Sequence, residues 1–375
     1  MRIGVDTREL MGRPTGAGRY LAELLGAWAD PGAGVAGRHE FVCYGPEPMP
    51  GAVAARIAPL GARAEVVPGR GGAWWEQTSL PRAAARDRLD LFFAPAYTAP
   101  LACACPVVLT IHDLSYFARP EWFTWREGLR RRLLTRLSAR RAALVLTDTD
   151  FSRSEIEFRL GLPAARMRVV PLGAGAPAPG GGPGPASGRN GTAEGREPLV
   201  LYVGSIFDRR RVPDLVAAFR LVLADVPDAR LEIIGENRTS PRQDLEALCR
   251  NSGAGSRIRL RSYVPDGELA DAFRRASAFA FLSEYEGFGL PPLEALARGV
   301  PPVLLDTPVA REVYGPAARY VPPGDVPAAA AALVDLLLRA PARAALLDRA
   351  GEVLARYSWP ETARLTMAAL ESARA

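Results

Sequence analysis

The chain has 375 residues, long enough for two domains with well-filled cores, and 48% of them are hydrophobic, which is typical of a soluble globular protein. All 47 basic side chains are arginine, which excludes a Schiff-base lysine, a pyridoxal phosphate lysine and a P-loop lysine. A net charge of +6 without a recognition motif argues against nucleic-acid binding. Four scattered cysteines and an immediate strand pattern lead us to expect a cytoplasmic protein without a signal peptide.

Short apolar runs alternate with helical patterns from the N-terminus to residue 172. Such alternation is typical of a doubly wound parallel sheet, so residues 1–172 are predicted to form one Rossmann-like α/β domain. Its strands are expected at residues 3–5, 40–44, 64–67, 91–93, 107–111, 144–147 and 168–170.

The composition changes over residues 173–197, where glycine, proline, alanine and serine dominate and little can be buried. We expect an interdomain linker or a disordered insertion there. A second alternation predicts another doubly wound domain over residues 198–356, followed by a final helix within residues 357–375. The strands of this second domain are expected at residues 199–203, 230–234, 257–261, 278–282, 302–305 and 319–321.

The segment Glu286-Gly-Phe-Gly-Leu-Pro-Pro-Leu-Glu294 carries two carboxylates separated by a glycine-containing loop. The first follows the apolar run 278–282, and the second lies in a helix expected at 291–298 with proline in its first turn. In an open α/β sheet this position is the ligand-binding crevice, where a helix N-terminus favours phosphate and carboxylates can hold sugar hydroxyls. The backbone N–H groups expected to meet the phosphate are those of Phe288, Gly289 and Leu290.

This segment resembles the E-x7-E motif of the family 4 retaining glycosyltransferases, in particular bacterial mannosyltransferases of cell-surface polysaccharide synthesis. The resemblance covers nearly the whole chain and implies the GT-B fold, with two Rossmann-like domains facing each other across a cleft and residues 357–375 crossing back to the first. It implies transfer of a hexosyl unit from a nucleoside diphosphate sugar, GDP-mannose being favoured, to a glycan or lipid-linked acceptor. Neither a cofactor nor a metal ion is expected. The alternative for the motif is a strand-turn-helix with solvated carboxylates.

The same resemblance assigns roles within the second domain. Glu294 would grip the donor ribose, while Glu286 would contact the sugar hydroxyls and help stabilise developing positive charge. The nucleotide base is expected to be read by backbone groups near Val264.

A basic loop follows the first strand of the second domain, and in the family such a loop clamps the leaving diphosphate. Here Arg209 and Arg210 stand at the family's two basic positions after Gly204. Many relatives carry an earlier arginine directly after the glycine, where this chain has Ser205, so the clamp is expected to be weaker or shifted onto Arg209. The alternative is a solvated basic loop.

A glycine-rich stretch precedes the helix expected at residues 20–28. It resembles the family's first loop, which faces the donor diphosphate and the acceptor, and its contacts are expected from Gly16, Ala17 and Gly18. Its spacing differs from the dinucleotide-binding fingerprint, which disfavours a nicotinamide cofactor. The alternative is an ordinary βα turn.

His112 directly follows the apolar strand 107–111. The resemblance implies that this histidine lines the donor sugar, where it can hydrogen-bond a hydroxyl or orient the reacting centre. The alternative is a capping histidine. Asp148 and Asp150 match the D-x-D pattern of metal-dependent glycosyltransferases. We interpret both instead as caps of the helix expected at 151–160 and predict no metal site.

Residues 126–141 contain seven arginines, with aromatic residues just upstream and Leu129, Leu133 and Leu137 on one helical face. Such a helix can lie against anionic lipid headgroups or a lipid-diphosphate acceptor, which would make the protein peripheral on the inner face of the plasma membrane. The alternative is a helix that packs its leucines on the core and exposes its arginines.

Two further functions remain open at this point. A nucleotide-sugar epimerase can share the GT-B fold, although it would need more acid/base residues than a chain with two histidines offers. An inactive sugar-nucleotide-binding scaffold is the non-enzymatic alternative, which the glutamate pair disfavours and Ser205 keeps open.

Overall fold

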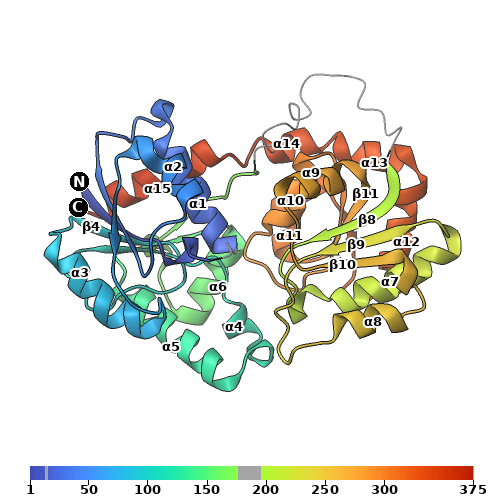
Figure 1. Cartoon of the computed structure of the whole chain (residues 1–375), viewed down its shortest axis with the longest axis horizontal. Coiled ribbons are helices and arrows are strands. Elements are labelled where there is room, and N and C mark those ends of the chain that lie inside the picture. Colours follow the sequence, from blue (N-terminus) through green and yellow to red (C-terminus); the bar gives the residue numbers. More distant parts are fainter. Residues whose placement is uncertain (13–15, 176–195, 375) are drawn as a thin grey trace. The chain divides into compact units, whose positions relative to one another are not determined.

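The computed structural model describes residues 1–12, 16–175 and 196–374, which form two compact units (Figure 1). The first unit comprises Met1–Gly173 together with Tyr357–Ala375, and the second comprises Ala174–Arg356. Most of the segment expected as a linker or insertion, residues 176–195, lies outside the described residues.

The first unit is built on a parallel sheet of seven strands in the order β3-β2-β1-β4-β5-β6-β7. Every strand expected from the sequence of this unit is present, within two residues at each end. The strands are β1 (Arg2–Asp6), β2 (Glu40–Gly45), β3 (Arg63–Val66), β4 (Leu91–Ala94), β5 (Val107–Thr110), β6 (Leu144–Thr147) and β7 (Met167–Val169).

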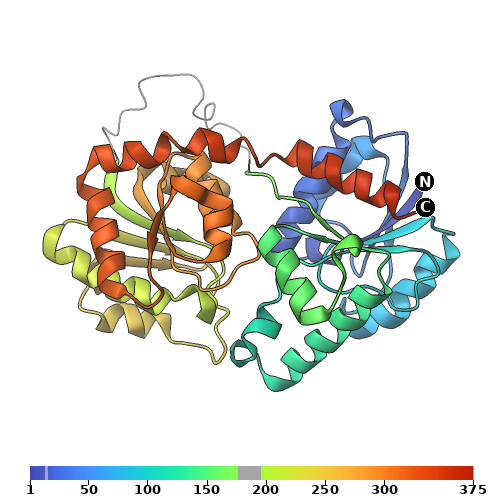
Figure 2. The same ribbon diagram turned by 180° about the vertical axis from the view of Figure 1, so that it is seen from behind.

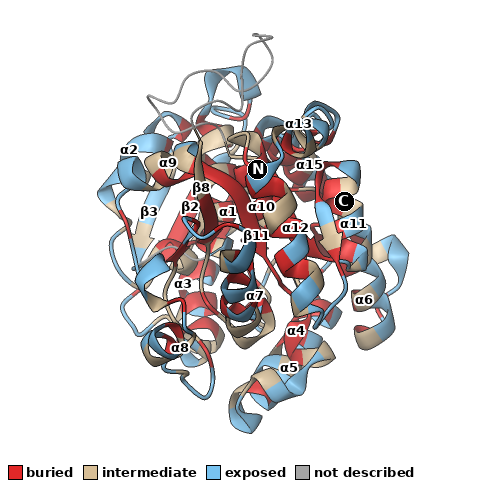
Figure 3. Ribbon diagram, turned by 90° about the vertical axis from the view of Figure 1, so that its right-hand side faces the viewer, coloured by how far each residue is buried: buried red, intermediate tan, exposed pale blue. Residues whose placement is uncertain are grey.

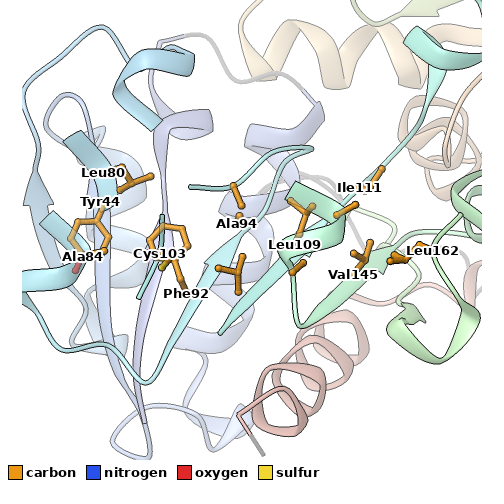
Figure 4. Close-up of a cluster of buried hydrophobic side chains, with 14 of the residues drawn as sticks. Tyr44, Leu80, Ala84, Phe92, Ala94, Cys103, Leu109, Ile111, Val145 and Leu162 are labelled. Carbon is orange, nitrogen blue, oxygen red and sulfur yellow. The ribbon is translucent and has the colours of Figure 1, made fainter. Parts of the chain in front are cut away.

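Helices cover both faces of this sheet (Figure 1), so its central strands are buried and largely apolar. Phe92, Leu109 and Val145, from three neighbouring strands, have no exposed surface and belong to one cluster of buried side chains (Figure 4). The helices of this unit include α1 (Gly16–Ala29), α2 (Gly51–Ile57), α3 (Leu80–Arg86), α4 (Ser115–Ala118), α5 (Trp125–Arg141), α6 (Asp150–Leu160) and α15 (Trp359–Ser372).

The C-terminal helix α15 packs on α1, so the end of the chain completes the first unit (Figure 2). Two long-range hydrogen bonds fix it: Trp28 Nε1 donates to the carbonyl of Ala363 over 3.0 Å, and Thr362 Oγ1 donates to that of Pro171 over 2.7 Å. A side chain at Gly173 would place its Cβ 2.4 Å from the backbone nitrogen of Trp359. Glycine therefore allows the chain to pass α15 as it leaves the first unit.

The second unit contains a parallel sheet of six strands in the order β10-β9-β8-β11-β12-β13. The strands are β8 (Glu197–Val203), β9 (Arg230–Ile234), β10 (Ile258–Arg261), β11 (Ala276–Phe281), β12 (Pro302–Leu305) and β13 (Arg319–Val321). Its helices include α7 (Val212–Asp225), α8 (Leu245–Asn251), α9 (Asp266–Arg275), α10 (Leu290–Ala297), α11 (Pro308–Tyr314), α12 (Val326–Leu338), α13 (Ala340–Leu347) and α14 (Ala350–Leu354). Figure 3 shows the central strands β8 and β11 as buried.

In each sheet the strand order reverses at one point, because the chain adds strands first on one side of the sheet's first strand and then on the other. In the first unit this point lies between β1 and β4, and in the second it lies between β8 and β11. Because all strands in each sheet are parallel, their carboxyl ends meet at one edge, and ligands of such sheets bind beyond the carboxyl ends at this point. The sequence prediction of two doubly wound α/β domains is confirmed.

Candidate functional site

Two glycines shape the loop that follows β8. Gly204 has a φ of +138°, and a Cβ on it would lie 2.8 Å from Nη1 of Arg210. A Cβ on Gly235, which follows the neighbouring strand β9, would lie 1.9 Å from the carbonyl oxygen of Gly204. The absence of both side chains lets the two loops approach each other and leaves room for the arginine beside them.

Arg210 and Glu286 form a buried ion pair beyond the carboxyl ends of the neighbouring strands β8 and β11. Arg210 Nε donates to Oε1 of Glu286 over 2.8 Å, while its Nη1 donates to the carbonyl of Ser205 over 2.8 Å. Ser283 Oγ donates to the same Oε1 over 2.9 Å. Burial lowers the pKa of Arg210, but the charge of Glu286 more than offsets this and raises it above its usual range. Arg210 therefore stays charged at neutral pH.

Arg209 extends this cluster. Its Nε lies 3.8 Å from Glu286 Oε1, and its guanidinium lies over the ring of Phe207, 4.5 Å from the centroid. The Nε atom is buried and makes no hydrogen bond within the described residues. Two guanidinium groups thus meet one carboxylate, which leaves an excess of positive charge and a hydrogen-bond donor at the crevice.

The loop after β11 leads directly into α10. Gly289 has a φ of +95°, which favours glycine, and the hydroxyl of Tyr314 donates to its carbonyl. Pro291 and Pro292 carry no N–H, so backbone donors at this end of α10 must come from Leu290 and the residues before it. Phe288 is buried. The structure therefore places Phe288, Gly289 and Leu290 at the helix N-terminus, as the sequence predicted.

Glu294 lies inside α10, and only 4% of it is exposed. Arg298, one turn later, brings Nη1 to 4.0 Å from Oε2 of Glu294. Val264 is buried and follows the edge strand β10, two strands away from β8 in the sheet.

In the first unit, His112 follows β5 and uses both ring nitrogens. Nδ1 lies 2.9 Å from Oδ2 of Asp148, and Nε2 lies 3.0 Å from the carbonyl of Pro95. A carbonyl can only accept, so Nε2 carries a proton, and a second proton is shared between Nδ1 and Asp148. Burial lowers the pKa of His112, but the carboxylate of Asp148 outweighs this effect and raises it. His112 is therefore a hydrogen-bond donor held in a fixed orientation rather than a free base.

The interpretation of Asp148 as a helix cap was wrong. Asp148 is buried against His112. Its carboxylate compensates the positive charge of the imidazolium, which would be costly to bury without a charged partner. Thr149 caps α6 instead, its Oγ1 accepting from the N–H of Ser152 over 3.0 Å, and Asp150 lies in the first turn. Within the described residues, no group of three or more His, Cys, Asp or Glu side chains is placed to hold a metal ion.

The expected glycine loop of the first unit also needs correction. Helix α1 begins at Gly16 and not at residue 20, so Gly16, Ala17 and Gly18 form its first turn. Gly16 is exposed while Gly18 is buried. Residues 13–15, which precede this turn, lie outside the described residues. Two glycines in a first turn are tolerated because its N–H groups have no intrahelical partner in any case.

The sequence analysis missed a buried polar cluster at the β1/β4 point of the first unit. Arg8 follows β1 and forms ion pairs with Asp6, at 3.2 Å, and with Glu76. Thr98, after β4, donates to Glu76 over 2.6 Å. Burial raises the pKa of Asp6 to about 6 against the opposing charge of Arg8. Charged residues immediately after the first strand were the signal that could have identified this cluster.

Tyr97 connects this end of β4 to His112. Its φ of +61° is unusual for a residue other than glycine, and its hydroxyl donates to Oδ2 of Asp113 over 3.1 Å. Its ring meets that of His112 edge-on, with centroids 5.7 Å apart. Strained backbone of this kind is concentrated at functional sites.

Two family models match the chain, one for each unit. Residues 14–174 match the family described as Glycosyltransferase Family 4, and residues 188–352 match the family described as Glycosyl transferases group 1. Together the two matches extend over most of both sheets, including the candidate site residues from Gly16 to Glu294.

Individual relatives are similar at modest identity. The O-antigen chain mannosyltransferase B of Escherichia coli is 30% identical over 231 residues, which cover 61% of this chain and 61% of that protein. The GDP-mannose:cellobiosyl-diphosphopolyprenol alpha-mannosyltransferase of Komagataeibacter xylinus is 31% identical over 167 residues, covering 44% of this chain and 42% of that protein. The matches thus span less than two thirds of either relative's length.

The fold is shared with solved structures across both units. The sucrose-phosphate synthase of Thermosynechococcus elongatus superposes with a TM-score of 0.74 at 18% identity, over 99% of this chain and 98% of that one. At this identity the likeness shows the fold, which is GT-B.

Proposed function

Because this chain carries the Glycosyltransferase Family 4 and Glycosyl transferases group 1 domains on a GT-B fold, we propose that it is a glycosyltransferase that moves a mannosyl unit from GDP-mannose to an acceptor hydroxyl, with retention at the anomeric carbon. The observation that supports this most strongly is the cluster of Arg209, Arg210 and Glu286 between β8 and β11. It combines excess positive charge for a diphosphate with a carboxylate for sugar hydroxyls.

The leaving diphosphate would be stabilised by fixed charges of the protein. Arg209 and Arg210 are held in place before any ligand arrives, and the N-terminus of α10 adds its dipole. Arginine guanidinium groups suit this task because their planar forks match phosphate oxygens. We propose that this arrangement makes transfer independent of a divalent metal ion. The departing phosphate oxygen would accept the proton of the acceptor hydroxyl.

Two further side chains would orient the sugar and the nucleotide. Glu294, buried in α10, would accept hydrogen bonds from the ribose hydroxyls. His112 would donate from Nε2 to a hydroxyl of the transferred sugar once that atom releases the carbonyl of Pro95. Glu286 would contact the sugar and stabilise positive charge that develops at the anomeric carbon.

Mannose as the sugar and a glycan or lipid-linked acceptor are supported by the names of the relatives. Both are mannosyltransferases; one acts in O-antigen chain synthesis and the other on a polyprenol-linked diphosphate. We propose that this enzyme acts in cell-surface polysaccharide or glycolipid synthesis, in the cytoplasm and peripherally at the inner face of the plasma membrane.

The test combines donor binding with product analysis. Thermal unfolding is measured with GDP-, UDP-, ADP- and dTDP-sugars, and GDP-mannose should give the largest stabilisation, about 2.7 kcal/mol at one hundred times its Kd. Labelled GDP-mannose is then incubated with a bacterial lipid extract, and the anomer formed is assigned by NMR. An α-mannoside formed in excess EDTA supports the proposal. An epimerised donor supports the epimerase, and neither product with intact binding supports an inactive scaffold.

A further inference from the structure

Helix α5 presents its apolar side chains outwards. The residues that it buries in the first unit are small or polar: Gly128, Thr135, Ser138 and Ala139. The exposed side carries Trp125 and three leucines. Their exposed fractions are 70% for Trp125, 54% for Leu129, 54% for Leu133 and 38% for Leu137. The leucine periodicity of this segment therefore does not mark the face that packs on the core.

These four side chains are spaced four residues apart. Residues at this spacing lie on neighbouring turns of one helix face, so Trp125, Leu129, Leu133 and Leu137 form a single stripe about 18 Å long. A second exposed aromatic lies on the adjacent helix, where Phe158 is 81% exposed. The helices are in contact there, because Arg136 Nη2 donates to the carbonyl of Arg159 over 3.4 Å.

The charge of the protein is concentrated on the same helix. Helix α5 contains seven arginines and one glutamate, a net charge of +6, which equals the net charge of the whole chain. The remaining residues therefore sum to zero. Most of these arginines are exposed, among them Arg126 and Arg130 on either side of the stripe's first turn. Glu127, the one carboxylate of α5, is paired with Arg131 at 2.6 Å.

We propose that the α5 face, defined by Trp125, Leu129, Leu133 and the arginines beside them, docks on an anionic lipid bilayer. The helix would lie in the plane of the interface, with the stripe among the upper acyl carbons and the guanidinium groups at the lipid phosphates. In the described ranges no helix is long and apolar enough to cross a bilayer, which fits a contact from one side.

The concentration of charge argues for lipid over a second copy of the chain. Pairing two α5 faces would bring two helices of +6 against each other, and this repulsion would oppose association. A layer of anionic headgroups provides opposite charge over the whole length of the helix. This inference extends the peripheral location proposed above but does not depend on the donor, the sugar or the chemistry of the β8/β11 site, so it can fail while the proposed mannosyl transfer holds.

Co-sedimentation of the full chain with lipid vesicles tests the proposal. We expect binding to vesicles of phosphatidylglycerol and phosphatidylcholine, none to phosphatidylcholine alone, and release at high salt. The apolar variant combines Leu129→Ser with Leu133→Ser, and the charge variant combines Arg126→Gln with Arg130→Gln. Each should weaken partitioning about tenfold or more. The matched control combines Leu338→Ser with Arg220→Gln, similarly exposed residues of the second unit, and should bind like wild type.

Tryptophan fluorescence with brominated lipids locates the contact. Quenching should occur with wild type and disappear in Trp125→Phe, which should still bind, whereas Trp74→Phe should retain the quenching although Trp74 is 81% exposed. Circular dichroism confirms that each variant folds, as expected for substitutions at exposed positions. The proposal is overturned if wild type stays in the supernatant with anionic vesicles, or if both α5 variants bind unchanged. If wild type is a dimer that does not bind vesicles, and the apolar variant is a monomer, the α5 face is instead a surface for self-association.

Discussion

The guanidinium of Arg210 donates from Nε to Oε1 of Glu286 over 2.8 Å, so these two proposed donor-binding groups neutralise each other. A diphosphate that binds Arg210 must therefore share it with a nearby negative charge. Substituting the arginine and substituting the glutamate should therefore change diphosphate binding in different directions.

We predict opposite effects on GDP binding from two single substitutions. Glu286→Gln removes the competing negative charge while keeping a hydrogen-bond acceptor, so GDP should bind several-fold more tightly although mannosyl transfer falls. Arg210→Gln should weaken GDP binding at least tenfold, because a charge-assisted contact to the diphosphate is lost. Isothermal titration calorimetry measures both dissociation constants.

Arg211→Gln is the matched control, since Arg211 has the same charge one position later but is exposed and pairs with Asp214 at 2.8 Å. It should bind GDP like wild type. Weaker binding of GDP by Glu286→Gln, in a variant that melts normally, would contradict the proposed competition.

The two histidines should titrate on opposite sides of the usual imidazole pKa of 6.5. The pKa of His112 is raised by Asp148 despite burial, whereas burial lowers that of His39. Proton NMR of the imidazole C–H signals measures both midpoints, and His39→Gln assigns them. In Asp148→Asn, burial of His112 is opposed only by the charge of Asp113 and the hydrogen bond to Pro95, so its midpoint should fall below 6.5.

The sign of the stability effect follows from the direction of the shift. Since the folded-state pKa of His112 exceeds its unfolded value, the contribution of His112 to stability is complete below pH 6.5 and is lost as the pH rises through the folded pKa. Relative to wild type, Asp148→Asn should therefore be most destabilised in acid. A pH-independent difference in the free energy of unfolding would speak against the ion pair.

Asp6 should make the protein less stable as the pH rises from 4 to 6. Its folded-state pKa is about 6, against an ordinary value of 3.8, so in this window the folded chain retains a proton that the unfolded chain has lost. The difference of about two units corresponds to about 3 kcal/mol. Urea unfolding at several pH values should show Asp6→Asn gaining about this much relative to wild type between pH 4 and 8.

Asp90 provides a comparison of opposite sign. The backbone N–H of Arg2 donates to Asp90 over 2.8 Å and, as the largest of several causes, lowers the pKa of this carboxylate. Its contribution to stability is present above the unfolded pKa and is lost as the pH falls. Asp90→Asn should therefore be destabilised at neutral pH and approach wild type in acid; parallel curves for the Asp6 and Asp90 variants would refute both assignments.

Gly235→Ala should damage the loop that carries the arginines. Its Cβ would lie 1.9 Å from the carbonyl oxygen of Gly204, and backbone cannot move aside as a flexible side chain can. We expect a loss of about 3 kcal/mol or more in the free energy of unfolding, together with weaker GDP binding. Gly267→Ala, with open space around its Cβ in the first turn of α9, should instead gain about 0.5–1 kcal/mol. Urea unfolding of both variants is the measurement.

The sequence determined the strands and the position of the candidate donor crevice in the second unit. A strand that is buried on both faces, such as β5 or β11, has a continuous apolar sequence. Each such apolar run predicted the ends of its strand to within two residues. The segment from Glu286 to Glu294 carries its own strand end, loop and helix start. Its local geometry depends on residues close in sequence, so it could be predicted from the motif.

Tertiary structure decided the contacts between residues far apart in the chain. His112 and Asp148 are separated by 36 positions, and Arg8 and Glu76 by 68, so neither ion pair is visible from local patterns. The pairing of β5 with β6 brings His112 and Asp148 to one edge of the sheet, and the helical turn Trp75–Ser79 brings Glu76 to Arg8, which follows β1.

Helix α5 shows the limit of periodicity most clearly. Its leucines repeat every four residues and predict one apolar face, but periodicity does not say which face the protein buries. Ser138 Oγ accepts from the N–H of Ala99 over 3.0 Å, a contact that requires the helix to approach the neighbouring loop closely. Small residues permit that approach and bulky leucines do not, so the packing of the first unit, and not hydrophobicity alone, left the leucines exposed.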